Sequence, residues 1–192
     1  GGNDAILLAG GATAPRDLPV PGRALTGIHF AMEYLTESNQ RCEGDPVPAL
    51  DAAEALTAKG KRVVIIGGGD TGADCLGTAH RQGARHVHQL ELLPRPPDER
   101  DPSNPWPMWP NIFRVSSAHE EGGERLYSIS TERFSGDARG RVTTLHAVKV
   151  EMVNTTGRVS FQPVAGTEFE IKAGLVLLAM GFIGPERNGM IE

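Results

Sequence analysis

Cysteine is scarce in this sequence, and its scarcity limits the chemistry that the chain can support. The 192 residues include two cysteines, Cys42 and Cys75, which stand far apart and form no C-x-x-C motif. No histidine lies near them at a spacing that suits zinc or an iron–sulfur cluster. We therefore expect two free thiols in a reducing compartment and no metal bound by this chain.

A long apolar run and an excess of positive charge are missing as well. The longest apolar stretch, residues 174–182, is far too short to span a bilayer, and no charged-then-apolar signal sequence opens the chain. The net charge of −5 and the pI near 5.7 give no overall attraction for nucleic acid or for an anionic membrane. We expect a cytoplasmic protein without a nucleic-acid or membrane partner, in which any basic site is local.

Glycine is abundant, and its most informative cluster follows an apolar run. Residues 63–66 read Val-Val-Ile-Ile, and the glycines after them lead into helix-compatible sequence. This pattern predicts a strand, a turn and a helix around a G-x-G-x-x-G fingerprint. The residues of the turn are Gly67, Gly68, Gly69, Asp70, Thr71 and Gly72.

Each glycine of the fingerprint has its own physical role. Gly67 allows a tight turn, Gly69 leaves room for a pyrophosphate, and Gly72 lets the helix press against the sheet. The helix that begins at about Thr71 directs free N–H groups and the positive end of its dipole at the same place. The turn therefore predicts a bound dinucleotide, with a purely structural turn as the alternative.

A second strand, expected at residues 86–92, carries the acid that such a site uses. Glu91 stands nineteen residues after Gly72, which is the spacing of a carboxylate that accepts hydrogen bonds from the adenosine ribose. Arg95, and Arg81 or Arg85, could instead pair with the 2′-phosphate of NADPH. We expect NADH or NADPH as the coenzyme and favour NADH, unless Glu91 is simply a charge at the end of a strand.

The first 60 residues predict short elements joined by loops. Residues 5–9 form an apolar strand pattern that ends in Gly10-Gly11, a pair that could either contact a cofactor or only end the strand. Apolar spacing predicts helices at residues 28–36 and 49–58. At the start of the first helix, His29 is expected to be a capping or surface residue.

A long segment rich in proline and tryptophan, residues 94–110, follows the second strand. Such a segment inside a compact domain is usually functional or a packed loop, so Trp106 and Trp109 either serve a function or plug a surface groove. We expect a helix to begin near Asn111. The later group His119-Glu120-Glu121 could act as an acid–base pair or lie at a solvated helix end.

The rest of the chain predicts β-structure. Alternating residues at about 125–134, 142–152 and 158–163 are separated by glycine-containing turns, which indicates an antiparallel meander of three strands. Residues 175–180 then form an apolar strand that ends at Gly181 and returns to the parallel sheet.

Four stretches carry a resemblance to a known family. They are residues 67–75 (GGGDTGADC), 90–94 (LELLP), 104–110 (NPWPMWP) and 177–186 (LLAMGFIGPE). They closely resemble the small (β) subunit, or pyridine-nucleotide half, of glutamate synthase. The similarity covers nearly the whole chain, and the Pro-Trp segment makes it far more specific than the glycine fingerprint alone.

The resemblance implies an α/β fold. A Rossmann-like NAD(P)-binding domain, with a parallel sheet and a three-stranded antiparallel β-meander, would be accompanied by remnants of a flavin-binding domain. Residues 1–60 would be a truncated flavin-domain edge and linker, residues 61–181 the NAD(P)H-binding domain, and residues 182–192 a truncated return to the flavin domain. The flavin-domain remnants that could touch a cofactor would then be Gly10, Gly11 and Gly181.

The resemblance also implies a role in electron input. A reduced nicotinamide coenzyme bound at the glycine turn would pass hydride to FAD in the neighbouring domain. In the complete enzyme, iron–sulfur centres and a second flavin would carry the electrons to glutamate formation from glutamine and 2-oxoglutarate, with the large subunit or domain as the partner.

This chain lacks three features of that family. They are the cysteine motifs beside the iron–sulfur centres, the first G-x-G-x-x-G for FAD, and the Gly-Asp segment expected after residues 177–186. We therefore expect the isolated chain to bind NAD(P)H, to hold neither FAD firmly nor an iron–sulfur cluster, and not to turn over.

Other functions are possible for a Gly-rich turn. A short-chain reductase is unsupported because neither tyrosine, Tyr34 or Tyr127, belongs to a Tyr-x-x-x-Lys motif. A methyltransferase that uses S-adenosylmethionine shares the turn and the ribose-binding acid, although a meander is unusual there. A non-catalytic nucleotide-binding module is the third alternative.

Overall fold

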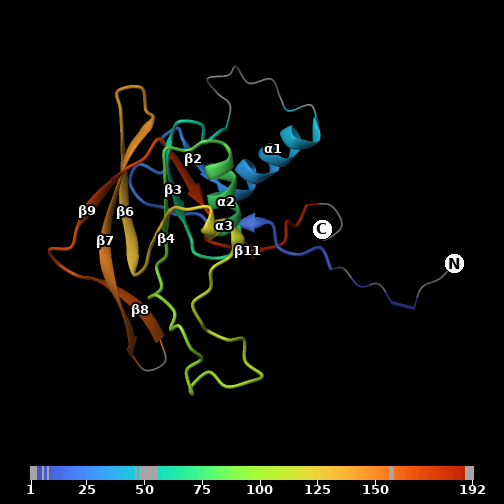
Figure 1. Cartoon of the computed structure of the whole chain (residues 1–192), viewed down its shortest axis with the longest axis vertical. Coiled ribbons are helices and arrows are strands. Elements are labelled where there is room, and N and C mark those ends of the chain that lie inside the picture. The colour runs from blue at the N-terminus through green and yellow to red at the C-terminus, as the bar shows by residue number, and fades with distance from the viewer. Residues whose placement is uncertain are drawn as a thin grey trace.

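The centre of the computed structural model is a parallel sheet. The structure describes residues 4–5, 7, 9–45, 47, 56–155 and 158–188. The sheet has five strands in the spatial order β2 (Ile28–Phe30), β10 (Leu175–Leu178), β3 (Arg62–Ile66), β4 (His86–Leu90) and β5 (Glu124–Leu126), all paired in parallel. Figure 1 shows β2, β3 and β4 of this sheet in the middle of the molecule.

Three helices cover one face of this sheet. They are α1 (Ala31–Glu43), α2 (Asp70–Arg81) and α3 (Ser117–Glu120). Val63 and Ile65 of β3 belong to the core that includes buried residues of α1 and α2, whereas Val64 belongs to the core on the opposite face. Successive side chains of a strand point to opposite faces of the sheet. Because both faces are covered, consecutive residues of β3 are apolar.

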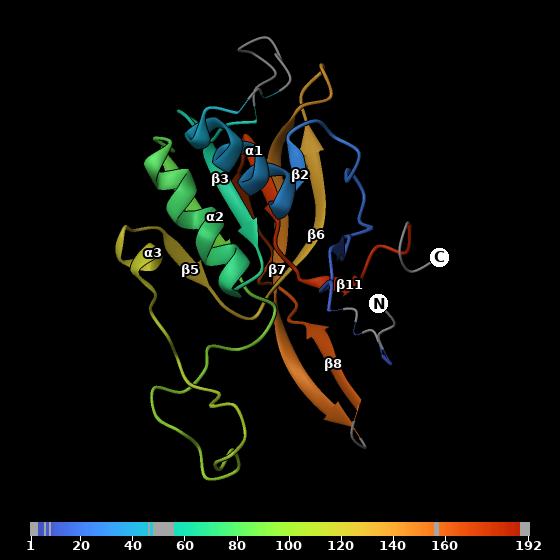
Figure 2. The ribbon, with the colours of Figure 1, turned by 90° about the vertical axis from the view of Figure 1, so that its right-hand side faces the viewer.

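The opposite face of the parallel sheet packs against antiparallel strands, and Figure 2 shows the sheet between these strands and the helices. These strands are β6 (Ile129–Gly136), β7 (Val142–Thr155), β8 (Arg158–Pro163) and β9 (Phe169–Lys172). The order β6-β7-β8 confirms the predicted meander, and β9 adds a further strand on β7 that the sequence did not predict. A separate pair, β1 (Ala14–Pro15) and β11 (Phe182–Gly184), is also antiparallel.

The predicted helix at residues 28–36 is wrong in its start and its length. Ile28 to Phe30 form β2, in register with Val176 to Leu178 of β10, and α1 then continues to Glu43. Gly44 ends it with φ 77°, a left-handed conformation that suits glycine. His29 therefore lies in a strand rather than at a helix start. Its Nδ1 is 3.6 Å from the Glu33 carboxylate.

Two further helix predictions also change. No helix begins at Asn111, because residues 111–116 are irregular and α3 begins only at Ser117. Of the predicted helix at 49–58, residues 49–55 lie outside the described residues, and residues 56–58 are not helical. Leu56 and Ala58 are nevertheless buried in the core beside α1 and α2.

The predicted strand at residues 5–9 is not found where the structure describes it. Ala5, Leu7 and Ala9 are exposed and belong to no strand, while residues 6 and 8 lie outside the described part. The predicted turn between the strands at residues 142–152 and 158–163 is described only up to Thr155. The expected domain limits at residues 60 and 181 stay predictions, although β2 and α1 pack in the same layers as β3 and α2.

The Pro-Trp segment forms a long loop after β4. Figure 1 and Figure 2 both show this loop projecting from the same end of the molecule as β8. Trp106 is 81% exposed and Trp109 is 78% exposed, so neither ring plugs a groove. Among the described residues, no helix is long and apolar enough to cross a membrane.

Candidate coenzyme site

The glycine turn connects β3 to α2 as the fingerprint predicted. Gly67 has φ 124°, and a Cβ there would collide with the backbone carbonyl of Ala179 after β10. Gly72 lies under the turn, where a Cβ would collide with the carbonyl oxygen of Gly67. Glycine at both positions therefore lets β10 and α2 approach the turn closely.

Gly69 differs from the other glycines of the turn because it faces open space. Nothing lies within 4 Å of the position that its Cβ would occupy. It is the N-cap of α2, with extended backbone angles, and the N–H groups of the first turn of α2 follow it. Asp70 is exposed and Thr71 is half-buried at this helix start. The space over Gly69 is thus the place where an anion would meet free backbone donors.

Glu91 turns its carboxylate onto the glycine turn. Its Oε2 accepts a hydrogen bond of 2.7 Å from the N–H of Gly68, and its Oε1 accepts one of 3.0 Å from the N–H of Leu93. A Cβ at position 68 would strike this carboxylate, which explains the glycine between Gly67 and Gly69. Glu91 is therefore a structural part of the turn and not a free charge at a strand end.

A relay of hydrogen bonds through Gln89, His119 and Ser116, which the sequence did not predict, holds the glycine turn in place. The buried side chain of Gln89 donates from Nε2 to the carbonyl oxygen of Gly67 at 3.0 Å, and its Oε1 lies 3.0 Å from His119 Nε2. The N–H of Ser116 donates to His119 Nδ1 at 3.1 Å. Because Nδ1 accepts, the ring proton must lie on Nε2, which donates to Gln89.

His119 is consequently a neutral positioning group. Burial lowers its pKa from the ordinary histidine value, and the nearby charge of Arg125 lowers it further. Glu120 is exposed, and Glu121 pairs with Arg81 at 2.9 Å. The neighbouring carboxylates therefore do not form an acid–base pair with His119 in this arrangement.

A cavity of about 600 Å³ opens beside the turn, beyond the carboxyl ends of β3 and β4. Gly68, Gly69 and Glu91 line one side of it, and residues 109–116, at and after the end of the Pro-Trp segment, line another. Met152 of β7 contributes to the wall. The crevice outside the carboxyl ends of the strands is the usual ligand position in an open α/β sheet.

Two arginines that the sequence analysis missed line this cavity. Arg125 donates to the carbonyl oxygen of Arg114 at 3.0 Å and lies over the rings of Phe113 and Tyr127. Arg114 lies 4.6 Å from the centre of the Trp109 ring. The positions of both arginines depend on how the loop folds back onto β5, and no local sequence motif predicts the path of the loop.

Arg95, the predicted phosphate partner, is not among the residues that line the cavity. It pairs with Asp98 at 2.6 Å and packs over the Phe113 ring at 4.0 Å from its centre. Its role at a 2′-phosphate stays a prediction, and this geometry favours Arg114 and Arg125 instead.

The three predicted flavin contacts lie apart from this cavity. Gly10 and Gly11 are exposed in the amino-terminal segment, with nothing within 4 Å of a Cβ at either position. Gly181 follows β10, and its carbonyl oxygen accepts the N–H of Arg16 at 2.9 Å. Their contact with a flavin stays a prediction. Within the described residues, no group of three or more His, Cys, Asp or Glu side chains could hold a metal ion.

Comparisons with known proteins agree with this arrangement. A model of the pyridine nucleotide-disulphide oxidoreductase family matches residues 2–104. The glutamate synthase [NADPH] small chain of Mycobacterium tuberculosis is 59% identical over 98% of this chain, and the glutamate synthase [NADH] of Schizosaccharomyces pombe is 46% identical over 96%. This chain spans 38% of the first relative and 9% of the second.

The solved structures include the same fold. FprA from Mycobacterium tuberculosis in complex with NADPH has a TM-score of 0.60 and 18% identity, covering 94% of this chain and 50% of that one. The similarity in fold extends over both the parallel sheet and the antiparallel strands, since it covers nearly the whole chain.

Proposed function

This chain belongs to the pyridine nucleotide-disulphide oxidoreductase family, and from that premise we propose that it binds NADPH and delivers electrons to the flavin of a longer protein. The observation that carries the proposal is the open space over Gly69, bordered by backbone donors and by the Glu91 carboxylate. Membership of this family argues against the methyltransferase alternative.

The residues of the cavity suit the parts of a dinucleotide. The pyrophosphate would lie over Gly69 at the start of α2, where the helix dipole and free N–H groups favour negative charge. Glu91 would face the adenosine ribose. The hydroxyl of Tyr127, which lines the cavity, is buried without a hydrogen-bond partner among the described residues. A bound ligand would supply that partner.

The proposal departs from the preference for NADH that Glu91 suggested. The Glu91 carboxylate already accepts two backbone N–H groups, which reduces its repulsion of a 2′-phosphate. Arg114 and Arg125 line the same cavity and can pair with that phosphate. The relative with 59% identity is named for NADPH, and the one with 46% identity is named for NADH.

The work of this chain would be to position the coenzyme. The turn fixes the pyrophosphate, the arginines fix the adenosine end, and the loop excludes water beside it. FAD in the parent protein would supply the redox chemistry. Gly10 and Gly11, the expected flavin contacts, are exposed in this chain. The parent would be a glutamate synthase, forming glutamate from glutamine and 2-oxoglutarate with its large subunit or domain.

Titration of the chain with NADPH and NADH tests the coenzyme assignment. We expect tighter binding of NADPH, and Arg114→Gln should weaken NADPH binding about tenfold, because one charge-assisted hydrogen bond is lost, while NADH binding changes little. Arg133→Gln, on the exposed face of β6, is the control. Equal effects of Arg114→Gln on both coenzymes would refute the assignment of this arginine to the 2′-phosphate.

A further inference from the structure

A second cavity, of about 790 Å³, lies at the opposite end of the parallel sheet from the glycine turn. It is bordered by the amino ends of β3 and β10, and by the start of β7. The five residues of β3 separate the two ends by roughly 16 Å. A molecule in this cavity would therefore not touch the coenzyme turn.

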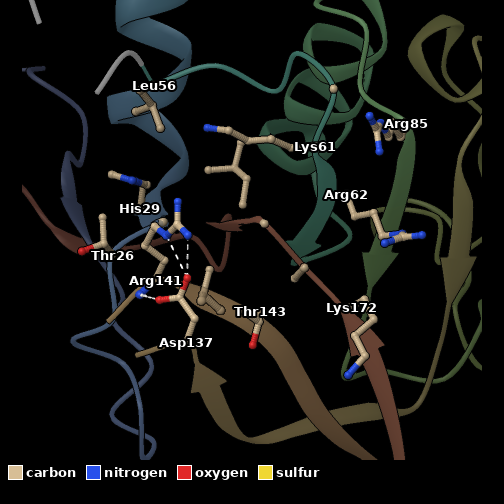
Figure 3. A pocket seen from close by; sticks show the side chains of 16 residues that line it. Thr26, His29, Leu56, Lys61, Arg62, Arg85, Asp137, Arg141, Thr143 and Lys172 are labelled. Carbon is tan, nitrogen blue, oxygen red and sulfur yellow. Dashed lines mark hydrogen bonds and ion pairs between the residues drawn. The ribbon is translucent and has the colours of Figure 1, made fainter. Parts of the chain in front are cut away.

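The lining of this cavity is strongly basic, although the whole chain carries a net charge of −5. Its cationic residues are Lys61, Arg62, Arg85, Arg141 and Lys172, and Asp137 is the one carboxylate among its described residues. We call this cavity the basic bowl. Figure 3 shows Arg62, Arg85 and Lys172 along one side of the basic bowl and Arg141 with Asp137 on the other.

The fold brings these cations together from separate elements. Lys61 and Arg62 stand at the start of β3, and Arg85 precedes β4, whose His86 pairs in register with Arg62. Arg141 precedes β7 and forms a bridge with Thr26, just before β2. The amino ends of parallel strands and a turn of the antiparallel sheet thus meet at one corner of the molecule. No local sequence pattern predicts that these cations lie together.

The carboxylate of Asp137, the one that lines the basic bowl among the described residues, is already engaged. Asp137 accepts hydrogen bonds from the backbone N–H groups of Arg139 and Arg141 and pairs with the Arg141 guanidinium at 2.7 Å. The backbone N–H of Arg141 is the largest cause of its lowered pKa, followed by the Arg141 side chain. Asp137 therefore has little capacity left to neutralise the other cations.

Three cations of the basic bowl have no counter-ion among the described residues. Within the described part of the chain, the side chains of Lys61, Arg62 and Arg85 make no hydrogen bond or ion pair. Lys172 lies 3.7 Å from Glu170 and donates to Thr144 Oγ1 at 3.1 Å. Burial also lowers the pKa of Lys61, so its charge is partly desolvated. Cations gathered in this way without acceptors repel one another, and an anion between them would remove that repulsion.

We propose that the basic bowl binds a small polyanion that carries two or more phosphate or carboxylate groups. The guanidinium groups of Arg62 and Arg85 can bind such groups in a bidentate manner. Lys61, which extends toward Leu56 and His29 in Figure 3, adds a point charge. The site is independent of the coenzyme proposed above.

Calorimetric titration with tripolyphosphate at physiological salt tests this proposal. Because tripolyphosphate could also bind at the glycine turn, the titration is repeated on Gly69→Asp, in which a carboxylate repels anions from that turn. We expect binding in both proteins. The double variant Arg62→Ala/Arg85→Ala should weaken it at least about tenfold. Both side chains are exposed, so the fold should be retained, and thermal unfolding confirms this.

The matched control is Arg133→Ala/Lys149→Ala, which removes two exposed charges from β6 and β7 outside both cavities. This control should bind tripolyphosphate as the unaltered chain does. The proposal is overturned if the control weakens binding equally, or if Gly69→Asp abolishes it. Displacement of tripolyphosphate by citrate would assign a carboxylate ligand to the basic bowl, and binding of tripolyphosphate without displacement would assign a phosphate ligand.

Discussion

At the scale of the residue, neighbouring glycines of one turn serve different purposes. Gly67 and Gly72 are required by the protein itself, because backbone or side-chain atoms occupy the space of a Cβ. Gly68 makes room for Glu91, and only Gly69 faces open space. A substitution at Gly69 therefore separates ligand binding from folding, which a substitution at Gly67 cannot do.

The relay through His119 predicts a dependence of stability on pH. Its folded-state pKa is lowered, so the unfolded chain binds more protons than the folded chain as pH falls through the ordinary histidine range. The stabilisation by neutral His119 is therefore present above the unfolded pKa of about 6.5 and is lost below it. His119→Ala should reduce the free energy of unfolding by about 1 kcal/mol at pH 7.5.

Urea unfolding at pH 7.5 and pH 5.5 measures this effect. The difference in free energy of unfolding between the unaltered chain and His119→Ala should shrink at pH 5.5. The lowered pKa of His29 affects both proteins equally, so it cancels in the difference. A difference that stays constant between the two pH values would show that the relay does not depend on a neutral His119.

Individual residues were predicted unevenly from the sequence. The fingerprint spacing predicted the tight turn at Gly67 and the close approach at Gly72, because those roles are local to one turn, whereas the pyrophosphate over Gly69 stays a prediction. Gln89 could be suspected only as a polar residue in an apolar strand, and its partner, thirty residues away, depends on the path of a long loop. Arg114 and Arg125 were missed for the same reason.

At the scale of the element, α2 joins the coenzyme turn to the core. Cys75, Leu76 and Ala79 are fully buried and share a core with Val63 and Ile65 of β3. Burial raises the pKa of the Cys75 thiol to about 12, and the charge of Asp74 adds to this effect. Cys75 is thus a packing residue, and its thiol stays protonated at neutral pH.

The packing of α2 predicts that the two cysteines react at very different rates. With a chromogenic disulfide reagent at pH 8, the exposed thiol of Cys42 should react promptly, whereas the buried Cys75 should react only after denaturation. The release of one equivalent of chromophore before denaturant and a second after it would agree with this packing. Prompt reaction in a Cys42→Ser variant would contradict it.

Elements defined by local pattern were predicted better than those defined by distant pairing. The apolar run of β3 and the alternation of β6 to β8 are visible in short windows of sequence. β2 is only three residues long and exists because it pairs with β10, nearly 150 residues later. Its apolar residues consequently resembled the first turn of the helix that follows it.

At the scale of the whole molecule, a layer of helices and a layer of antiparallel strands enclose one parallel sheet. Helices cover the face that contains Val63 and Ile65, and antiparallel strands cover the face that contains Val64. The cavities lie at opposite ends of the sheet, one beside the glycine turn and one at the basic bowl. The proposed electron-input role concerns the end beside the glycine turn. A ligand in the basic bowl would therefore act on a separate part of the surface.

The central claim is that a pyrophosphate lies over Gly69, and the binding of NADPH to two variants at this position tests it most directly. Asp and Asn are both preferred N-cap residues, so Gly69→Asp and Gly69→Asn should keep or raise the thermal stability of the chain. Only Asp adds a negative charge. Followed by nicotinamide fluorescence, NADPH should bind Gly69→Asp at least about tenfold more weakly than Gly69→Asn. Equal affinities of the two variants for NADPH would contradict the claim.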